Sequence, residues 1–206
     1  MANTSEAIII FIRNPELGKV KTRLAGEVGD EAALAIYRHL LQHTYKVVQQ
    51  SPAAKLVGYS NEIIAKDLWQ GSSFQKFKQK GEDLGERMLT AFQDAFNSGF
   101  DRVIIIGSDL MSLDKKHIEG AFRALHQNKV VIGPAIDGGY YLLGLTQIPP
   151  AIFKDKNWGT STVLKETLAN LDTKEYQLLE PLNDIDYKED MMSYPELVEL
   201  LHKYSK

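Results

Sequence analysis

The chain has 206 residues, of which 44% are hydrophobic and 25% are charged, and its formal net charge at pH 7 is −3. This composition is ordinary for a globular protein with a sizeable core, and the charge balance gives no overall attraction to nucleic acid or to an anionic membrane surface. The absence of cysteine excludes disulfides, thiolate nucleophiles and zinc–thiolate sites. The first residues lack the pattern of a signal peptide and no apolar run is long enough for a membrane span, so we expect a cytoplasmic protein with no nucleic-acid partner.

The first strong structural signal is an apolar run, rich in β-branched residues, over residues 7–12. Such a run predicts a strand that is buried on both faces of a sheet. The run breaks at Asn14-Pro15, and Gly18 opens a loop that carries cations at every second position: Lys19, Lys21 and Arg23. A buried strand leading into a basic, glycine-containing loop is how α/β proteins hold phosphate groups at the carboxyl edge of a sheet. A solvated surface loop is the simpler interpretation, and on both interpretations we expect the loop to be exposed.

Strand and helix patterns alternate along most of the chain. Further strands are expected over residues 55–59, 73–79, 102–106, 130–133 and 140–145, with 73–79 alternating like an edge strand. Helices are expected over residues 30–50, 62–69, 84–97, 115–125, 163–171 and 194–204. Asp137-Gly138, between two apolar runs, predicts a hairpin. This order predicts a three-layer α/β/α sandwich with a mostly parallel mixed sheet, in one domain spanning residues 1–206.

Two polar positions lie where such sheets place ligands. Asp109 comes just after the strand at 102–106, and a carboxylate there can hold Mg²⁺ or Mn²⁺, although Asp also commonly satisfies turn amides. The helix entry at Asp83-Leu84-Gly85 allows close backbone approach to a ligand, although, taken alone, a capping box between Asp83 and Glu86 is the favoured interpretation. Neither a GxGxxG nor a Walker A pattern is present, so the sequence supports neither a dinucleotide oxidoreductase nor a P-loop NTPase.

Six blocks, taken in order over nearly the whole chain, give a more specific signal. They are Phe11-Ile12-Arg13-Asn14-Pro15 with Gly18 and Lys21-Thr22-Arg23-Leu24, Asp83 to Met88, Gly107-Ser108-Asp109, Gly133-Pro134, Asp137 to Tyr141, and Asp184-Ile185-Asp186. This set resembles a bacterial family of GT-A-type glycosyltransferase-like proteins associated with radical-SAM and selenium-related genes. The family is part of the nucleotide-diphospho-sugar transferase superfamily and is related to phospholactate and molybdenum-cofactor guanylyltransferases.

The resemblance implies a GT-A fold, a nucleotide or nucleotide-sugar ligand, a small-molecule acceptor, and Mg²⁺ or Mn²⁺. The nucleotide-binding residues that it implies are Phe11, Arg13, Pro15, Gly18, Lys19, Lys21, Arg23, Leu84, Gly85 and Ser108. The acceptor-binding residues that it implies are Gly138, Gly139, Tyr140, Trp158 and Thr160. Asp109 and Asp186 would hold the metal, and the catalytic residues would be Asp137, Lys21 and Arg23.

The chain departs from the family's pattern directly after Asp109. Relatives usually continue with Cys-Pro, and classical GT-A enzymes have an Asp-x-Asp, whereas here Leu110-Met111-Ser112 follows. The metal would then depend on Asp137 or Asp186, or bind weakly. Three functions stay open: a metal-dependent transferase with a nucleotide-sugar donor, a nucleotidyltransferase that joins an NTP to a phosphorylated acceptor, and a non-catalytic nucleotide-binding protein.

Overall fold

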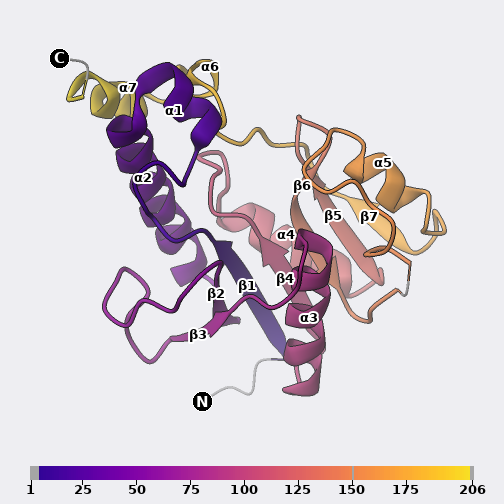
Figure 1. Ribbon diagram of the computed structural model, residues 1–206. Coiled ribbons are helices and arrows are strands. Elements are labelled where there is room, and N and C mark those ends of the chain that lie inside the picture. The colour runs from indigo at the N-terminus through magenta and orange to yellow at the C-terminus, as the bar shows by residue number, and fades with distance from the viewer. Residues whose placement is uncertain (1–4, 150, 205–206) are drawn as a thin grey trace.

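The computed structural model describes residues 5–149 and 151–204, and its centre is a seven-stranded sheet with the order β3-β2-β1-β4-β6-β5-β7 (Figure 1). The strands are β1 (Glu6–Ile12), β2 (Ala54–Tyr59), β3 (Phe74–Lys78), β4 (Arg102–Ile106), β5 (Val130–Pro134), β6 (Tyr140–Leu145) and β7 (Tyr176–Leu178). Of these strands, only β6 runs against the others, since it pairs antiparallel with both β4 and β5 while the remaining pairs are parallel. The predicted mostly parallel mixed sheet is therefore confirmed, with β3 at its edge as expected.

Helices cover both faces of this sheet. They are α1 (Thr22–Val28), α2 (Asp30–Gln49), α3 (Leu84–Asn97), α4 (Lys115–Leu125), α5 (Val163–Leu168), α6 (Lys188–Met191) and α7 (Pro195–His202). Tyr37 of α2 and Phe122 of α4 belong to the apolar cluster on one face, whereas Phe92 of α3 belongs to the cluster on the other face, against which Leu164 of α5 packs. The three-layer α/β/α arrangement is confirmed.

The position of β1 in the sheet explains why apolar and polar residues do not alternate along it. Ile8 and Ile10 pack into the cluster beneath α2 and α4, while Ala7 and Ile9 pack into the cluster beneath α3 and α5. All four side chains are 0% exposed, because β1 lies between β2 and β4 and has helices on both sides. A strand in this position has no solvent-facing side that would accept a polar residue.

The predicted helix at 62–69 is wrong, because that stretch folds as an irregular loop. The Lys76 ammonium of β3 donates to the carbonyl oxygens of Ile64 at 2.7 Å and Ala65 at 3.2 Å, and it also bonds the Asp67 carboxylate at 2.7 Å. Trp69 is 1% exposed and anchors the loop in the core. The Lys76 side chain of β3 thus bonds backbone carbonyl oxygens that, in a helix, would have accepted hydrogen bonds from the helix's own amides.

Three short elements were not expected from the sequence: α1, β7 and α6. The helix predicted over 163–171 also ends early, at Leu168. Helices α1 and α6 gain their stability from a third apolar cluster, formed with α2 and α7 and including Leu24, Ile185 and Met191. Short helices depend on such packing rather than on their own propensity. None of the helices in the described part of the chain is long and apolar enough to cross a membrane.

Candidate functional site

A cleft of about 870 Å³ opens at the carboxyl edge of the sheet. The chain enters it directly after β1, β2, β3 and β4, because the carboxyl ends of parallel neighbours meet at one edge. Seven of the ten predicted nucleotide-binding residues line the cleft: Phe11, Arg13, Lys19, Lys21, Arg23, Leu84 and Ser108. The other three, Pro15, Gly18 and Gly85, do not line it.

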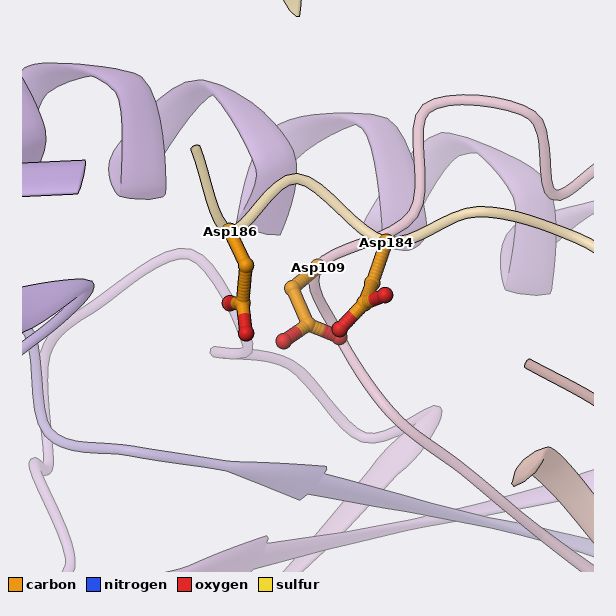
Figure 2. A group of neighbouring side chains, drawn as sticks. All are labelled: Asp109, Asp184 and Asp186. Atoms are coloured by element: carbon orange, nitrogen blue, oxygen red, sulfur yellow. The ribbon is translucent and has the colours of Figure 1, made fainter. Parts of the chain in front are cut away.

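Three aspartates converge in this cleft (Figure 2). Asp109 follows β4, whereas Asp184 and Asp186 come from the segment between β7 and α6. One carboxylate oxygen from each residue can be chosen so that all three lie within 4.8 Å of one another. Asp109 and Asp186 were expected to be metal ligands, while Asp184 was not named for this role and Asp137 lies outside this group of three.

The acidic segment, residues 183–187, is fixed against Asp109 by its backbone. The Ile185 amide donates to the Asp109 carbonyl oxygen at 3.1 Å, and the Ile185 side chain is 0% exposed in the third apolar cluster. In an extended segment, residues two apart point to the same side. With Ile185 directed into the core, Asp184 and Asp186 therefore both face the cleft.

Asp190 of α6 holds the acidic segment from its other end. Its carboxylate accepts hydrogen bonds from the amides of Asp186 at 3.0 Å and Tyr187 at 2.7 Å, and from the Asn183 side chain at 2.7 Å. These contacts leave the carboxylate of Asp186 free to face the cleft. The sequence signal for this arrangement was the Asp-x-Asp spacing at 184–186, which places both carboxylates on one side of the chain.

Two cations of the predicted basic loop contact these aspartates. The Lys21 ammonium lies 2.8 Å from Asp109 Oδ2 and 2.8 Å from Asp186 Oδ1, and Arg23 donates to Asp186 Oδ2 at 2.8 Å. The expectation of an exposed loop is wrong at Lys21, whose side chain is only 6% exposed, but correct at Lys19 and Arg23. Lys21 is the N-cap residue of α1 and has the left-handed backbone conformation, with φ = 47°.

The charges in the site are unbalanced. Burial, followed by the neighbouring carboxylates of Asp109, Asp186 and Asp137, raises the pKa of Asp184 to about 6. Burial acts in the same direction on Asp186, but Lys21 and Arg23 outweigh it and lower the pKa of that carboxyl overall. The carboxylates in turn raise the pKa of Lys21 despite its burial. Three carboxylates face two cations, so the site is one positive charge short of neutrality when all are ionised.

This donor set fits a hard divalent cation. Mg²⁺ and Mn²⁺ prefer carboxylate oxygens, and three such oxygens from two separate stretches of chain can be gathered around one ion. The carboxylate missing directly after Asp109 is thus supplied by the acidic segment. Leu110 and Met111, which replace the usual pattern there, are 1% and 8% exposed and belong to the core.

A smaller pocket of about 170 Å³ adjoins the cleft and shares Leu84, Asp137, Gly159 and Asp184 with it. Four of the five predicted acceptor-binding residues line it: Gly139, Tyr140, Trp158 and Thr160. The fifth, Gly138, lies behind the wall, where its carbonyl accepts from the Leu164 amide. Asp137 is the exposed tip of the predicted hairpin, in which its carboxylate accepts from the Gly139 amide at 2.9 Å.

Packing explains why position 85 is a glycine, which its sequence motif did not indicate. A Cβ atom at this position would lie 2.4 Å from the Trp158 ring, so the start of α3 packs directly on the wall of the small pocket. The predicted cap of α3 is confirmed, since Asp83 accepts from the Glu86 amide at 2.8 Å. The Glu86 carboxylate reaches the Glu82 amide rather than that of Asp83.

Several polar residues that line the cleft were not expected from the sequence. The Tyr37 hydroxyl accepts from the Arg13 amide at 2.8 Å and lies 3.3 Å from the Ser108 hydroxyl, which ties the end of β1 to the end of β4. Gln79 donates to the carbonyl oxygens of Ile12 and Gly58, which ties together the ends of β1, β2 and β3. These residues lie on different elements, so no local sequence motif could connect them.

Comparison with known proteins identifies the family to which the sequence is similar. A family model described as "Uncharacterized protein conserved in bacteria (DUF2064)" matches residues 41–160. No curated protein matches the sequence.

Solved structures give the fold. A protein from Desulfovibrio desulfuricans G20, provisionally assigned as a nucleotide-diphospho-sugar transferase, is 31% identical with a TM-score of 0.84, and 98% of each chain is covered. The inositol-1-phosphate CTP transferase from T. maritima is 13% identical with a TM-score of 0.57, covering 98% of this chain and 97% of that one. Glucosyl-3-phosphoglycerate synthase from Mycobacterium tuberculosis, solved with Mn²⁺ and UDP, is 11% identical with a TM-score of 0.57, covering 98% of this chain and 80% of that one. The predicted nucleotide-diphospho-sugar transferase fold is confirmed, while the resemblance to radical-SAM- and selenium-associated members stays a prediction.

Proposed function

The chain belongs to the bacterial family DUF2064, and we propose that it is a metal-dependent transferase that takes a nucleotide-sugar donor and a small-molecule acceptor. The observation that carries this proposal is the convergence of Asp109, Asp184 and Asp186 with Lys21 and Arg23 in a large cleft, which Asp184 connects to an adjoining small pocket. The large cleft has room for a nucleotide, and the small pocket has room for one further group.

The donor would occupy the large cleft. Arg13, Lys19, Lys21 and Arg23 line it and supply positive charge for the phosphates, while Phe11 and Leu84 offer apolar surface for the nucleoside. Asp109, Asp184 and Asp186 would hold Mg²⁺ or Mn²⁺, which when bound stabilises the negative charge of the leaving nucleoside diphosphate.

Asp137 would act on the acceptor, because it lines both the large cleft and the small pocket. An acceptor hydroxyl in the pocket would form its bond to the anomeric carbon of the sugar as the bond to the nucleoside diphosphate breaks. The proton of that hydroxyl would pass to the exposed Asp137 carboxylate. Trp158 and Tyr140 would form the wall against which the reacting groups lie.

Nucleotidyl transfer is the second candidate, supported by the fold shared with the inositol-1-phosphate CTP transferase from T. maritima. In that reaction an oxygen of the acceptor phosphate attacks the α-phosphorus of an NTP, and pyrophosphate leaves. The same cations would neutralise the charge that develops on the phosphates. The donor and the bond broken therefore distinguish the two reactions, whereas the residues involved are shared.

The first test is a thermal-shift panel of nucleoside triphosphates and nucleotide sugars, each with Mg²⁺, Mn²⁺ or EDTA. A ligand of the native state raises the melting temperature by mass action, so we expect a metal-dependent rise with one class of nucleotide. Asp109→Asn should abolish the metal dependence, and the exposed Asp94→Asn on α3 is the matched control. A rise that is indifferent to metal and to Asp109→Asn would favour the non-catalytic nucleotide-binding protein.

The second test separates the two reactions by running each in reverse. Pyrophosphate with product releases NTP only in a nucleotidyltransferase, and that result would exclude the glycosyl-transfer proposal. Release of nucleotide sugar from a nucleoside diphosphate and product would support glycosyl transfer.

A further inference from the structure

Lys21 occupies an unusual position for a residue expected to bind phosphate. Its side chain is 6% exposed, and its ammonium contacts two of the three aspartates at 2.8 Å each. A solvated phosphate-binding lysine would instead keep its side chain exposed, as Lys19 does: its side chain is 67% exposed and its ammonium pairs with Glu16 at 2.6 Å. The buried ammonium is therefore positioned to interact with the carboxylates.

The contacts of Lys21 use oxygens that a metal ion would need. Asp109 Oδ2 and Asp186 Oδ1 bond Lys21, while Asp186 Oδ2 bonds Arg23. A divalent ion that bound the same carboxylates would compete with the ammonium for these oxygens, and the two cations would repel each other strongly at such short range. Lys21 and the metal ion are therefore alternatives rather than neighbours.

We propose that Lys21 is a built-in substitute for the metal ion, which the arriving metal displaces onto the phosphates of the nucleotide. This inference rests on the metal site and the nucleotide site of the proposed function. The flexible Lys stem lies in a cleft that other cations share, so the released ammonium can reach a phosphate there. Metal and nucleotide would then bind cooperatively, because the metal frees Lys21 for the phosphates and the phosphates draw Lys21 away from the carboxylates.

Binding of Mn²⁺ to Lys21→Met, followed by electron paramagnetic resonance of the free ion, tests the competition directly. Met keeps the apolar stem and removes the competing charge, so we expect the affinity for Mn²⁺ without nucleotide to rise about tenfold or more. Lys129→Met is the matched control, and we expect it to leave the Mn²⁺ affinity unchanged. Lys129 pairs with Glu175 and directly precedes β5, so it lies at the amino end of that strand, away from the carboxyl edge of the sheet where the cleft opens.

The outcomes separate this inference from the proposed function. If Lys21→Met binds Mn²⁺ more weakly than the wild-type protein, Lys21 only positions the carboxylates and the inference fails while the metal site stands. If neither protein binds Mn²⁺, with or without nucleotides from the panel, both the inference and the metal-dependent function fail.

A measurement on the wild-type protein covers the case in which Lys21→Met does not fold. Acetylation of lysine amines, read by mass spectrometry, should be slow at Lys21 in EDTA because the ammonium is buried between two carboxylates. Saturating Mn²⁺ should raise labelling at Lys21 several-fold while labelling at Lys129 stays the same. Unchanged protection of Lys21 when Mn²⁺ is bound would overturn the displacement.

Discussion

Asp184 is an aspartate of the site whose ionised form is disfavoured by its surroundings. Its pKa is raised to about 6 by burial first and then by Asp109, Asp186 and Asp137, with Lys21 acting in the opposite direction. The folded-state pKa thus lies above the ordinary value of 3.8. Ionising Asp184 therefore destabilises the native state, and the stability present below about pH 4 is lost as the pH rises through 6.

We expect Asp184→Asn to stabilise the metal-free protein at neutral pH. In EDTA at pH 7.5, the free energy of unfolding should rise by about 1–3 kcal/mol, because the substitution removes a charge that the fold disfavours. Below about pH 4 the two proteins should be equally stable. Denaturant unfolding at both pH values measures this, and a difference of equal size at both would show that the effect is not electrostatic.

Gly85 offers a second prediction at the scale of a single residue. A Cβ at Gly85 would lie 2.4 Å from the Trp158 ring, so Gly85→Ala should lower the free energy of unfolding by about 1–3 kcal/mol through overpacking. Gly120→Ala, within α4, is the matched control, because the nearest atom to its new Cβ is the end of the Arg123 side chain at 4.0 Å. That variant should gain about 0.5–1 kcal/mol from helix propensity. Thermal unfolding of both variants measures these changes in stability. Equal changes in the two variants would contradict the packing of α3 on Trp158.

At the scale of elements, the acidic segment determines whether the site exists. It brings Asp184 and Asp186 to Asp109 from 75 and 77 positions further along the chain. The buried Ile185 side chain and one backbone hydrogen bond attach the segment directly to the Asp109 side of the site, and Asp190 of α6 holds it from its other end. Stability of the fold and assembly of the proposed metal site can therefore be separated by mutation.

Ile185→Ala and Leu197→Ala form a matched pair for this separation. Both side chains are 0% exposed and belong to the third apolar cluster, so each variant should lose about 2–5 kcal/mol of stability. Only Ile185→Ala should also weaken Mn²⁺ binding, by about tenfold or more, because it loosens the acidic segment. Measuring the Mn²⁺ affinity of both under native conditions tests this, and an equal loss in both would mean that the segment is held by other contacts.

Elements defined by local patterns could be predicted from the sequence, and elements defined by distant contacts could not. A few neighbouring residues are enough to predict β1 and β4 from their continuous apolar runs, and the start of α4 from its cap at Asp114. The loop at 62–69 has a helical composition, but Lys76 of another strand binds its carbonyl oxygens. The sequence of α1 gives no helical signal, because its only buried residue is Leu24 and a helical pattern needs more than one.

The candidate site divides in the same way. Asp109 follows a buried strand, a position that general rules of α/β sheets identify as a ligand site. Asp184 could not be chosen from the sequence with the same certainty, because its role depends on Ile185 entering a core cluster built from α1, α2, α6 and α7. The burial of Lys21 was likewise invisible, since both of its partners lie at least 88 positions away along the chain.

On the scale of the whole molecule, the cleft is divided into two compartments that meet at Asp137 and Asp184. Residues that follow strands β1 to β5 line the two compartments, together with the stretch after β6 that carries Trp158 and with the acidic segment. The two substrates of a transferase can thus be contacted by separate sets of residues. Binding of donor and acceptor should then respond to different mutations.

Filling the small pocket should separate the two binding steps. Thr160→Trp adds bulk at an exposed position that lines the small pocket only, so we expect donor affinity to change less than twofold and the KM of the acceptor to rise about tenfold or more. Ser161→Trp, the exposed neighbour outside both linings, controls for the added bulk. Thermal shift with the donor and turnover with the acceptor measure the two effects. A loss of donor binding in Thr160→Trp would show that the pocket belongs to the donor.

The position of the acidic segment also sets the moment at which the protein becomes competent during its synthesis. A nascent chain can form β1, β4 and the hairpin at Asp137 once those residues have left the ribosome, but Asp184 and Asp186 emerge only afterwards. Until then two of the three carboxylates of the site are missing, including the Asp186 carboxylate that pairs with Lys21 in the folded protein. The growing polypeptide therefore acquires the complete group of three aspartates only after the sheet that supports it has been translated.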